Sequence, residues 1–523
     1  MNKLHISLKQ LAGAGMVAGA TILMAGCTDK FEELNTNKTK LTTLGANEYP
    51  YLFSRAQQQA SYSDGTYQIA QNLFADLYSQ YFATSATYFP SDRYVMRMDW
   101  LPGHWNPIYT QVVPQLKTLL DQTDKASAEN ALAKIWWVMA FHRLTDYYGP
   151  IPYFKAGEPG RSVAYDPQDK IYEDFFKKLD EATTVLKGKT AEKPYGNFDL
   201  IYKGDVNKWI KFANTLRLRL ALRVSKVTPA VAKTQAEAAV AGGVMTDIAD
   251  DAWMVKNLAG SDHNGLGRIA VWNEFRMSAS MESVLKGYAD PRIGIYFQPA
   301  TTTNTFEGLR NGLTPAQLGE AINSNNANSN VGTRWVSGSG AAWTSNLTVP
   351  QNIMHAAEAY LLRAEGALNG WNMGGTAQAM YEKGIEMSMR QWGITAADAI
   401  TAYINSDKTP IAPEDGLKSP ALSNIPVKWG ATEAVQREQI GTQKWLALYP
   451  DGLEAFAEFR RTRFPKLYPI ANSDNADLPA GTFIRRIPFL DVEKQTNGAA
   501  VKAAESLLGG PDKVSTPLWW DKN

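Results

Sequence analysis

Residues that could carry out catalysis are sparse in this chain of 523 residues. Of its five histidines, one stands at position 5, and none of the others forms an H-E-x-x-H pair or another pair with metal-ligand spacing. The sequence contains neither a Walker loop nor a G-x-S-x-G nucleophile elbow. Residues 265–270 fit the dinucleotide pattern G-x-G-x-x-A, but they follow a polar run rather than a buried strand. We therefore predict no catalytic residue, no metal ligand and no cofactor.

Aromatic residues, in contrast, are abundant, with 15 Trp and 23 Tyr. A sugar ring has apolar C–H groups on its faces and hydroxyl groups at its edge, so its site needs an exposed aromatic face bordered by hydrogen-bonding side chains. Two segments offer this mixture, residues 88–105 and a later loop set. Their residues are Asp92, Arg93, Asp99, Trp100 and His104 in the first, and Asp262, Asn264, Trp272, Trp335 and Trp343 in the second.

The N-terminus has the pattern of a lipoprotein signal peptide. A charged start precedes a weakly apolar run too short and too rich in Gly and Ala for a good membrane span, and Cys27 follows two small residues. Cys27 is the only cysteine, which excludes an intramolecular disulfide, and it resembles the lipidated cysteine of a bacterial lipobox, although Met24 stands where Leu is usual. We predict that residues 1–26 are removed, that Cys27 carries lipid and that residues 27–45 form a tether.

Charge gives no sign of a polyanionic partner. Without residues 1–26 the chain has 51 basic and 52 acidic residues, a net charge near −1. Nucleic-acid binding is therefore not expected.

Two long helices are predicted in the first half of the chain. Residues 128–148 have apolar side chains near helical spacing and end at a Gly-Pro pair. Residues 205–225 begin at Asp205, a good N-cap, and continue with the same spacing.

A helix pair is predicted later in the chain. Residues 353–368 place apolar and small side chains on one helical face, and a second helix is expected to begin at the cap Thr376. Ala377, Tyr381 and Gly384 match the spacing in the second helix of a tetratricopeptide repeat. No 34-residue period recurs along the chain, so a generic helical hairpin remains the alternative.

These patterns predict a mostly α-helical fold with little β structure. Residues 46–523 are expected to form one domain, with a helical scaffold over 46–257 and 351–523. Between its halves, residues 258–350 are rich in Asn, Ser, Thr and Gly and lack periodicity. Long polar loops of this kind lie at the surface and are often functional, so this segment is the predicted ligand-binding region.

Taken together, several runs resemble the SusD/RagB family of Bacteroidetes outer-membrane nutrient-binding lipoproteins. The similarity spans nearly all of the chain after Cys27. The runs that carry it are TQKWLALYPDG (442–452), EFRRT (458–462), RLTDYYGPIP (143–152), GDVNKW (204–209), RRIP (485–488), GGPDK (509–513) and LWWD (518–521).

The resemblance implies a fold built on tetratricopeptide-like helix pairs, with the ligand held by loops on one face. It also implies a lipid-anchored position at the outer membrane, and the acidic residues after Cys27 are similar to the signal that exports such lipoproteins to the cell surface. The implied partner is a SusC-like, TonB-dependent transporter, to which the protein would deliver oligosaccharide. A peptide ligand is the alternative within the family, and a helical lipoprotein hydrolase is a distant third.

Analogy with the family also selects ligand-binding residues from the two aromatic segments. One aromatic plate is expected from each segment, bordered by hydrogen-bonding side chains. The expected plates are Trp100, Trp272, Trp335 and Trp343, and the expected hydrogen-bonding residues are Arg93, Asp262 and Asn264. Motif residues in or beside helices are predicted to be structural instead: Asp146, Tyr147, Trp445, Arg460 and Arg461.

Overall fold

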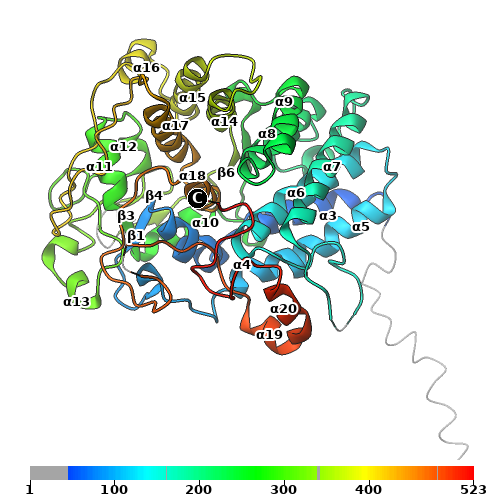
Figure 1. The fold of residues 1–523 in the computed structure, drawn as a ribbon, viewed down its shortest axis with the longest axis horizontal. Helices are drawn as coiled ribbons and strands as arrows, with labels where there is room; N and C mark the ends of the chain where they lie inside the picture. Colours follow the sequence, from blue (N-terminus) through cyan, green and yellow to red (C-terminus); the bar gives the residue numbers. More distant parts are fainter. Residues whose placement is uncertain (1–44, 161, 339–341, 480, 523) are drawn as a thin grey trace, which may run out of the picture. The chain divides into compact units, whose positions relative to one another are not determined.

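Helices account for most of the regular structure in the computed structural model, which describes residues 45–160, 162–338, 342–479 and 481–522 (Figure 1). The predicted signal peptide, Cys27 and the tether up to residue 44 lie outside the described residues. Residues Pro50–Asn523 form one compact unit. Within the described residues, no helix is both long and apolar enough to cross a membrane.

The helices group into an early set, a middle set of short helices and a late set. The early set is α3 (Tyr49–Ala60), α4 (Pro102–Asn106), α5 (Val113–Gln122), α6 (Ala128–Tyr148), α7 (Gln168–Lys187), α8 (Val206–Arg223) and α9 (Pro229–Gly242). The middle set is α10 (Gly265–Ile269), α11 (Ala279–Gly287), α12 (Ile293–Tyr296) and α13 (Pro315–Leu318). The late set is α14 (Ala356–Leu368), α15 (Ala377–Gln391), α16 (Ala397–Ile404), α17 (Glu433–Leu448), α18 (Gly452–Thr462), α19 (Asp491–Thr496) and α20 (Gly498–Glu505).

The capping residues explain where the long helices begin. The side chain of Ser127 accepts a hydrogen bond from the backbone N–H of Asn130 at the start of α6, and Gly149, with φ 88°, follows its end. The side chain of Asp205 accepts hydrogen bonds from two backbone N–H groups at the start of α8. Both helices lie where the sequence predicts them, which confirms those predictions.

The helices pack in consecutive pairs, α6 with α7, α8 with α9 and α14 with α15, and α17 lies against α14 (Figure 1). In the last pair, Thr376 caps α15 as predicted. A Cβ atom on Gly384 would lie 2.6 Å from the Cγ atom of Leu361, so the absence of a side chain lets the two helices approach closely. The close approach of the two helices at a small residue, as predicted for this pair, is therefore present.

One predicted boundary is wrong. Residues Gln351–Met354 form strand β6 rather than the first turn of a helix, and α14 begins only at Ala356. Strand β6 pairs antiparallel with β2 (Ala252–Met254), so the backbone hydrogen bonds of the two strands hold this segment extended. Pairing with a distant strand outweighs the local helical pattern.

Strands are short in the described part of the chain. Strand β1 (Phe82–Thr84) pairs antiparallel with β3 (Phe275–Met277), and β4 (Val336–Ser337) pairs with β5 (Thr344–Ser345). The segment 258–350 thus contains the middle set of short helices and three strands between irregular stretches, which agrees with its predicted loop-rich character.

A network of buried ion pairs joins the helices. Arg219 on α8 pairs with Glu358 on α14 at 2.6 Å, and Arg223 on α8 pairs with Glu454 and Glu458 on α18 at 2.5 and 2.9 Å. All five side chains are buried. Removing one member would leave a buried charge without its partner, a change that typically costs about 3–5 kcal/mol.

The motif residues predicted to be structural belong to this interior. Each of the five is at most 3% exposed. Asp146 accepts hydrogen bonds from the side chains of Tyr172 and Trp520, and Arg460 donates to its backbone carbonyl. Three of the sequence runs therefore meet at one buried point, which confirms the structural role predicted for them.

Candidate functional site

The pairing of β1 with β3 brings the two aromatic segments together. Phe82 lies opposite Met277 and Thr84 opposite Phe275, although these residues are nearly two hundred positions apart in the chain. Just beyond the strands, the backbone N–H of Ser85 and the hydroxyl of Thr84 both donate to the carbonyl of Glu274, at 2.9 and 3.0 Å. The loop after β1 and the loop before β3 are thus fixed beside each other.

The side chain of Glu274 links these loops at the surface. One carboxylate oxygen accepts the hydroxyl of Tyr88 at 2.5 Å, and the other accepts the amide of Gln68 at 2.5 Å. The hydrogen bond between Tyr88 and Glu274 raises the pKa of Tyr88 to about 12, and partial burial is a smaller cause. The hydrogen bond to Glu274 holds the side chain of Tyr88 in a fixed orientation. Because Tyr88 is 64% exposed, its ring is open to a ligand.

A second group of rings continues from Tyr88. Its centroid lies 4.6 Å from that of Phe89, and Phe89 meets Trp100 edge to face at 5.6 Å. The guanidinium of Arg97 stands 4.4 Å from the centroid of Trp100, and Arg97 also pairs with Asp99 through two hydrogen bonds. Trp100 is half-buried, and one face of its indole is already occupied by Arg97.

Two residues before Glu274 in the chain, Trp272 ends the 3-10 helix η7 (Ala270–Trp272) and is 38% exposed. Strand β5 packs against η7, and Trp343 immediately precedes β5 and is half-buried. A Cβ atom placed on Gly65 would be 3.5 Å from the indole of Trp272, so this glycine lies directly beside it.

Next to Gly65 the surface is hollowed. The hollow has a volume of about 210 Å³ and is lined mainly by polar side chains. Asp64, in its lining, accepts a hydrogen bond from His263 at 2.8 Å and pairs with Arg268 at 3.2 Å. The remaining lining residues are Arg55, Gln59, Tyr62, Ser63, Thr66, Pro107, Gly260 and Ser261.

Together these features form one surface, which we call the aromatic surface: Tyr88, Trp100, Trp272 and Glu274, with the polar hollow beside Gly65. The ring of Phe89 is buried and lies against Tyr88 and Trp100. It offers apolar ring faces next to carboxylate, amide, guanidinium and hydroxyl groups. This is the combination that a sugar ring requires. No group of three or more His, Cys, Asp or Glu side chains in the described residues could hold a metal ion.

The prediction that Trp335 is an exposed plate is wrong. Its side chain is 1% exposed, and its ring lies 5.8 Å from the rings of both Trp392 and Tyr449. The backbone N–H of Gly332 donates to the carbonyl of Tyr296 and ties this part of the loop to the interior. The indole therefore anchors the loop.

The three predicted hydrogen-bonding residues also have internal partners, which contradicts their expected place at an exposed edge. Arg93 pairs with Asp474 at 2.6 Å and is 8% exposed. The side chain of Asp262 accepts hydrogen bonds from Lys256 and Ser63, both at 3.1 Å. Asn264 caps α10 by accepting from the backbone N–H of Gly267, and its amide donates to the carbonyl of Val349. These side chains position the loops around the aromatic surface.

The sequence prediction missed Tyr88 as a ring face, Glu274 and Gln68. Tyr88 lies at the edge of the predicted first segment, and its exposure depends on its hydrogen bond to Glu274. No local pattern marks Glu274, because its role arises from the pairing of two distant strands. Trp100, Trp272 and Trp343 lie at or beside the aromatic surface, and their role in ligand binding stays a prediction.

Comparison with known proteins places the chain among described relatives. Residues 32–521 match the SusD-like family model, described as the SusD and RagB outer membrane lipoproteins. A chitin-binding SusD homologue from Flavobacterium johnsoniae is 36% identical, with a TM-score of 0.83, over 91% of this chain and 99% of the other. A SusD-like protein from Bacteroides thetaiotaomicron is 33% identical, with a TM-score of 0.81, over 91% and 99%. No curated protein matches the chain.

Proposed function

This chain belongs to the SusD-like family of outer membrane lipoproteins, and from that premise we propose that it captures oligosaccharides at the cell surface for import. It is a binding protein rather than an enzyme. The observation that carries the proposal is the aromatic surface, where the strongly exposed Tyr88 donates a hydrogen bond to the carboxylate of Glu274 and the exposed indole of Trp272 stands two residues before Glu274 in the chain. Such a surface displaces water from sugar faces while leaving hydrogen-bonding groups at the edge.

Chitin oligosaccharides are the ligand class that we propose first. The support is the identity of 36% to a chitin-binding SusD homologue over nearly the whole of both chains. Chains of N-acetylglucosamine present an apolar ring face and an acetamido group on each sugar unit. The ring face would stack on Trp272 or Tyr88, and the acetamido group would take hydrogen bonds from the surrounding polar side chains.

We further propose that the protein is anchored by lipid on Cys27, needs no cofactor, and delivers its ligand to a SusC-like, TonB-dependent transporter. The family description as outer membrane lipoproteins supports the anchor. Co-purification from outer membranes tests the partner, since a stable complex would bring a large β-barrel protein with the lipoprotein. A Cys27→Ala variant should leave the outer membrane fraction.

Titration calorimetry with the protein lacking residues 1–27 tests the proposed function. The panel is chitohexaose, cellohexaose, maltohexaose and a mixture of short peptides. We expect saturable binding of chitohexaose, loss of that binding in the double variant Tyr88→Ala, Trp272→Ala, and no loss in Phe154→Ala, which removes an exposed ring outside the aromatic surface.

Binding of peptides in place of every glycan would contradict the oligosaccharide proposal. Release of reducing sugar by the purified protein would contradict its assignment as a binding protein.

A further inference from the structure

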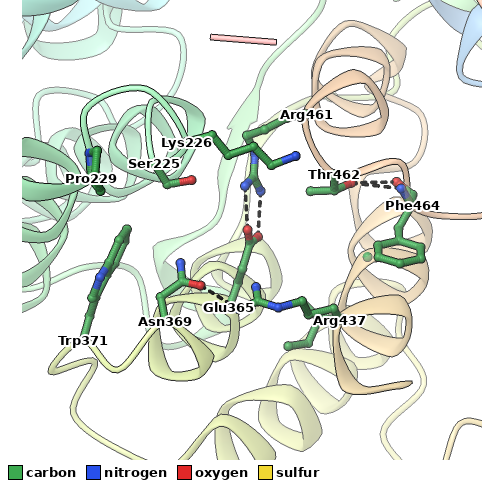
Figure 2. A pocket seen from close by; sticks show the side chains of 12 residues that line it. Ser225, Lys226, Pro229, Glu365, Asn369, Trp371, Arg437, Arg461, Thr462 and Phe464 are labelled. Carbon is green, nitrogen blue, oxygen red and sulfur yellow. Dashed lines mark hydrogen bonds and ion pairs between the residues drawn. The ribbon is translucent and has the colours of Figure 1, made fainter. Parts of the chain in front are cut away.

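A second cavity, unconnected with the residues of the aromatic surface, lies where the ends of several helices meet. Its volume is about 500 Å³, within the range of small-molecule sites. Its walls come from the end of α14, the middle of α17, the end of α18 and the connection between α8 and α9 (Figure 2). Among the residues that the structure describes, this hollow is more than twice the size of the one beside Trp272.

The cavity has an excess of positive charge. Lys226, Arg437 and Arg461 line it, together with a single carboxylate, Glu365. Arg461 holds both oxygens of Glu365, at 2.5 and 2.6 Å, and Lys444 adds a third contact at 2.9 Å. Glu365 is therefore already neutralised, and two further cations line the cavity: Arg437, which pairs with Glu433 outside the lining, and Lys226.

Of these two cations, Lys226 has the weaker compensation of its charge by neighbouring carboxylates. Its Nζ atom donates to the backbone carbonyl of Lys522 at 3.0 Å, and it forms no ion pair with a carboxylate in the described part of the chain. Partial burial lowers the pKa of Lys226, and repulsion by Arg461 and Arg463 lowers it further, whereas attraction by Asp521 and Glu365 raises it. An anion beside this amine would relieve that repulsion.

The contacts of Arg437 with Glu433 and Asn369 use its Nε and Nη2 atoms, so the N–H groups of its Nη1 atom can bind a ligand in the cavity. Arg437 donates to Asn369 at 2.9 Å and pairs with Glu433, whose side chain is 63% exposed. In the view of Figure 2, the side chain of Lys226 crosses that of Arg461, and Arg437 lies below the Arg461–Glu365 pair. Two cationic side chains thus approach one volume from two sides.

Aromatic side chains complete the lining. Trp371 and Phe464 stand on opposite sides of the pocket in the view of Figure 2, and both are partly exposed. Phe464 packs directly on α17, because a Cβ atom on Gly441 would lie 2.3 Å from its Cβ. Ser225, Asn369 and Thr462 add hydroxyl and amide groups to the same lining.

We propose that this cavity is a second ligand site, for a small sugar acid whose carboxylate binds Lys226 and Arg437 while its ring packs against Trp371. The positive charge of the lining favours a ligand with a carboxylate, and the indole of Trp371 favours a ligand with a ring that can pack against it. The hydroxyl and amide groups of the lining favour a ligand with hydrogen-bonding groups at the edge of that ring. The site is independent of the aromatic surface, so its failure would leave the proposed capture of oligosaccharides untouched.

Ligand-observed NMR and calorimetry at low ionic strength, on the protein lacking residues 1–27, test this proposal. Glucuronate is the probe. Glucose controls for the ring without the charge, and acetate and phosphate control for the charge without the ring. We expect saturable binding of glucuronate, at least about tenfold weaker binding of all three controls, and weakening as salt is added.

Variants locate the site. Lys226→Gln keeps most of the side-chain length and removes the charge, so we expect roughly tenfold weaker binding of glucuronate, as for a lost charge-assisted hydrogen bond. Trp371→Ala should weaken binding as well. Lys233→Gln, which removes an exposed lysine on α9, and Trp272→Ala should leave the affinity for glucuronate unchanged.

Equal binding of glucose and glucuronate would overturn the proposal, and so would binding of phosphate as tight as that of glucuronate, which would mark an ion site only. An unchanged affinity in Lys226→Gln, or no saturation with glucuronate, would also overturn it.

Discussion

At the scale of single residues, the function depends on which indoles face solvent. Trp272 is 38% exposed beside Glu274, whereas Trp335 is 1% exposed between Trp392 and Tyr449. Both stand in the same polar segment of the sequence, so composition predicted that the segment holds ligand-binding tryptophans but did not distinguish these two. The distinction depends on long-range packing, which local sequence does not encode.

Trp272→Ala should weaken the binding of chitohexaose by about 30-fold, because truncating an aromatic residue at a binding hot spot typically costs about 2 kcal/mol. The melting temperature should change little, since the side chain is partly in solvent. Calorimetry and thermal unfolding of the same sample measure both. A large loss of stability with unchanged affinity would show that Trp272 is a packing residue.

Trp335→Ala should show the opposite pattern. Removing a fully buried indole leaves a cavity and is expected to lower the free energy of unfolding by about 3–5 kcal/mol. Urea denaturation measures this change. Unaltered stability together with lost ligand binding would contradict the burial that we describe.

At the scale of elements, the long helices were predictable and the short strands were not. Ser127 and Asp205 cap the starts of α6 and α8, and apolar side chains at helical spacing predict that each helix continues from there. Strands β1 and β3 have three residues each, and their pairing joins segments nearly two hundred residues apart. A three-residue strand has no detectable period, so neither this pairing nor the aromatic surface that it assembles could be read from the sequence.

Gly384→Ala tests the close packing of α14 and α15. The added methyl group would lie 2.6 Å from Leu361, so we expect a loss of about 1–3 kcal/mol from overpacking, although alanine favours helix. Gly498→Ala in α20 meets no atom within 4 Å and is the matched control. Equal stability of the two variants in urea would contradict the packing that we assign to Gly384.

At the scale of the whole molecule, a chain with one cysteine relies on its interior for stability. Three family motifs meet there, those that carry Asp146, Arg460 and Trp520. The resemblance predicted the helical fold, and the position of the motif residues in or beside helices predicted their structural role. The pairing within the buried network, such as Arg219 with Glu358 and Arg223 with Glu454, follows from the arrangement of the helices. It was not predictable from the residues alone.

Stability should depend on pH through Asp76. Burial raises the pKa of Asp76 from 3.8 to about 7, although Tyr67, Gln71 and Asn72 donate hydrogen bonds to its carboxyl group. A raised pKa in the folded state means that its contribution is fully present below pH 3.8 and is lost as the pH rises through about 7.

Relative to Asp76→Asn, the unmodified protein should therefore lose stability between pH 5 and 7, by about 1 kcal/mol per pH unit. Urea denaturation at several pH values measures the difference. Parallel pH profiles for the two proteins would show that Asp76 stays ionised in the folded state.

A crystal structure of the protein bound to chitohexaose would test the central claim most directly. We predict that one sugar ring lies on the indole of Trp272, that the ligand contacts Tyr88, and that Trp335 stays buried. A ligand bound elsewhere, with the faces of Trp272 and Tyr88 still open to solvent, would contradict the account.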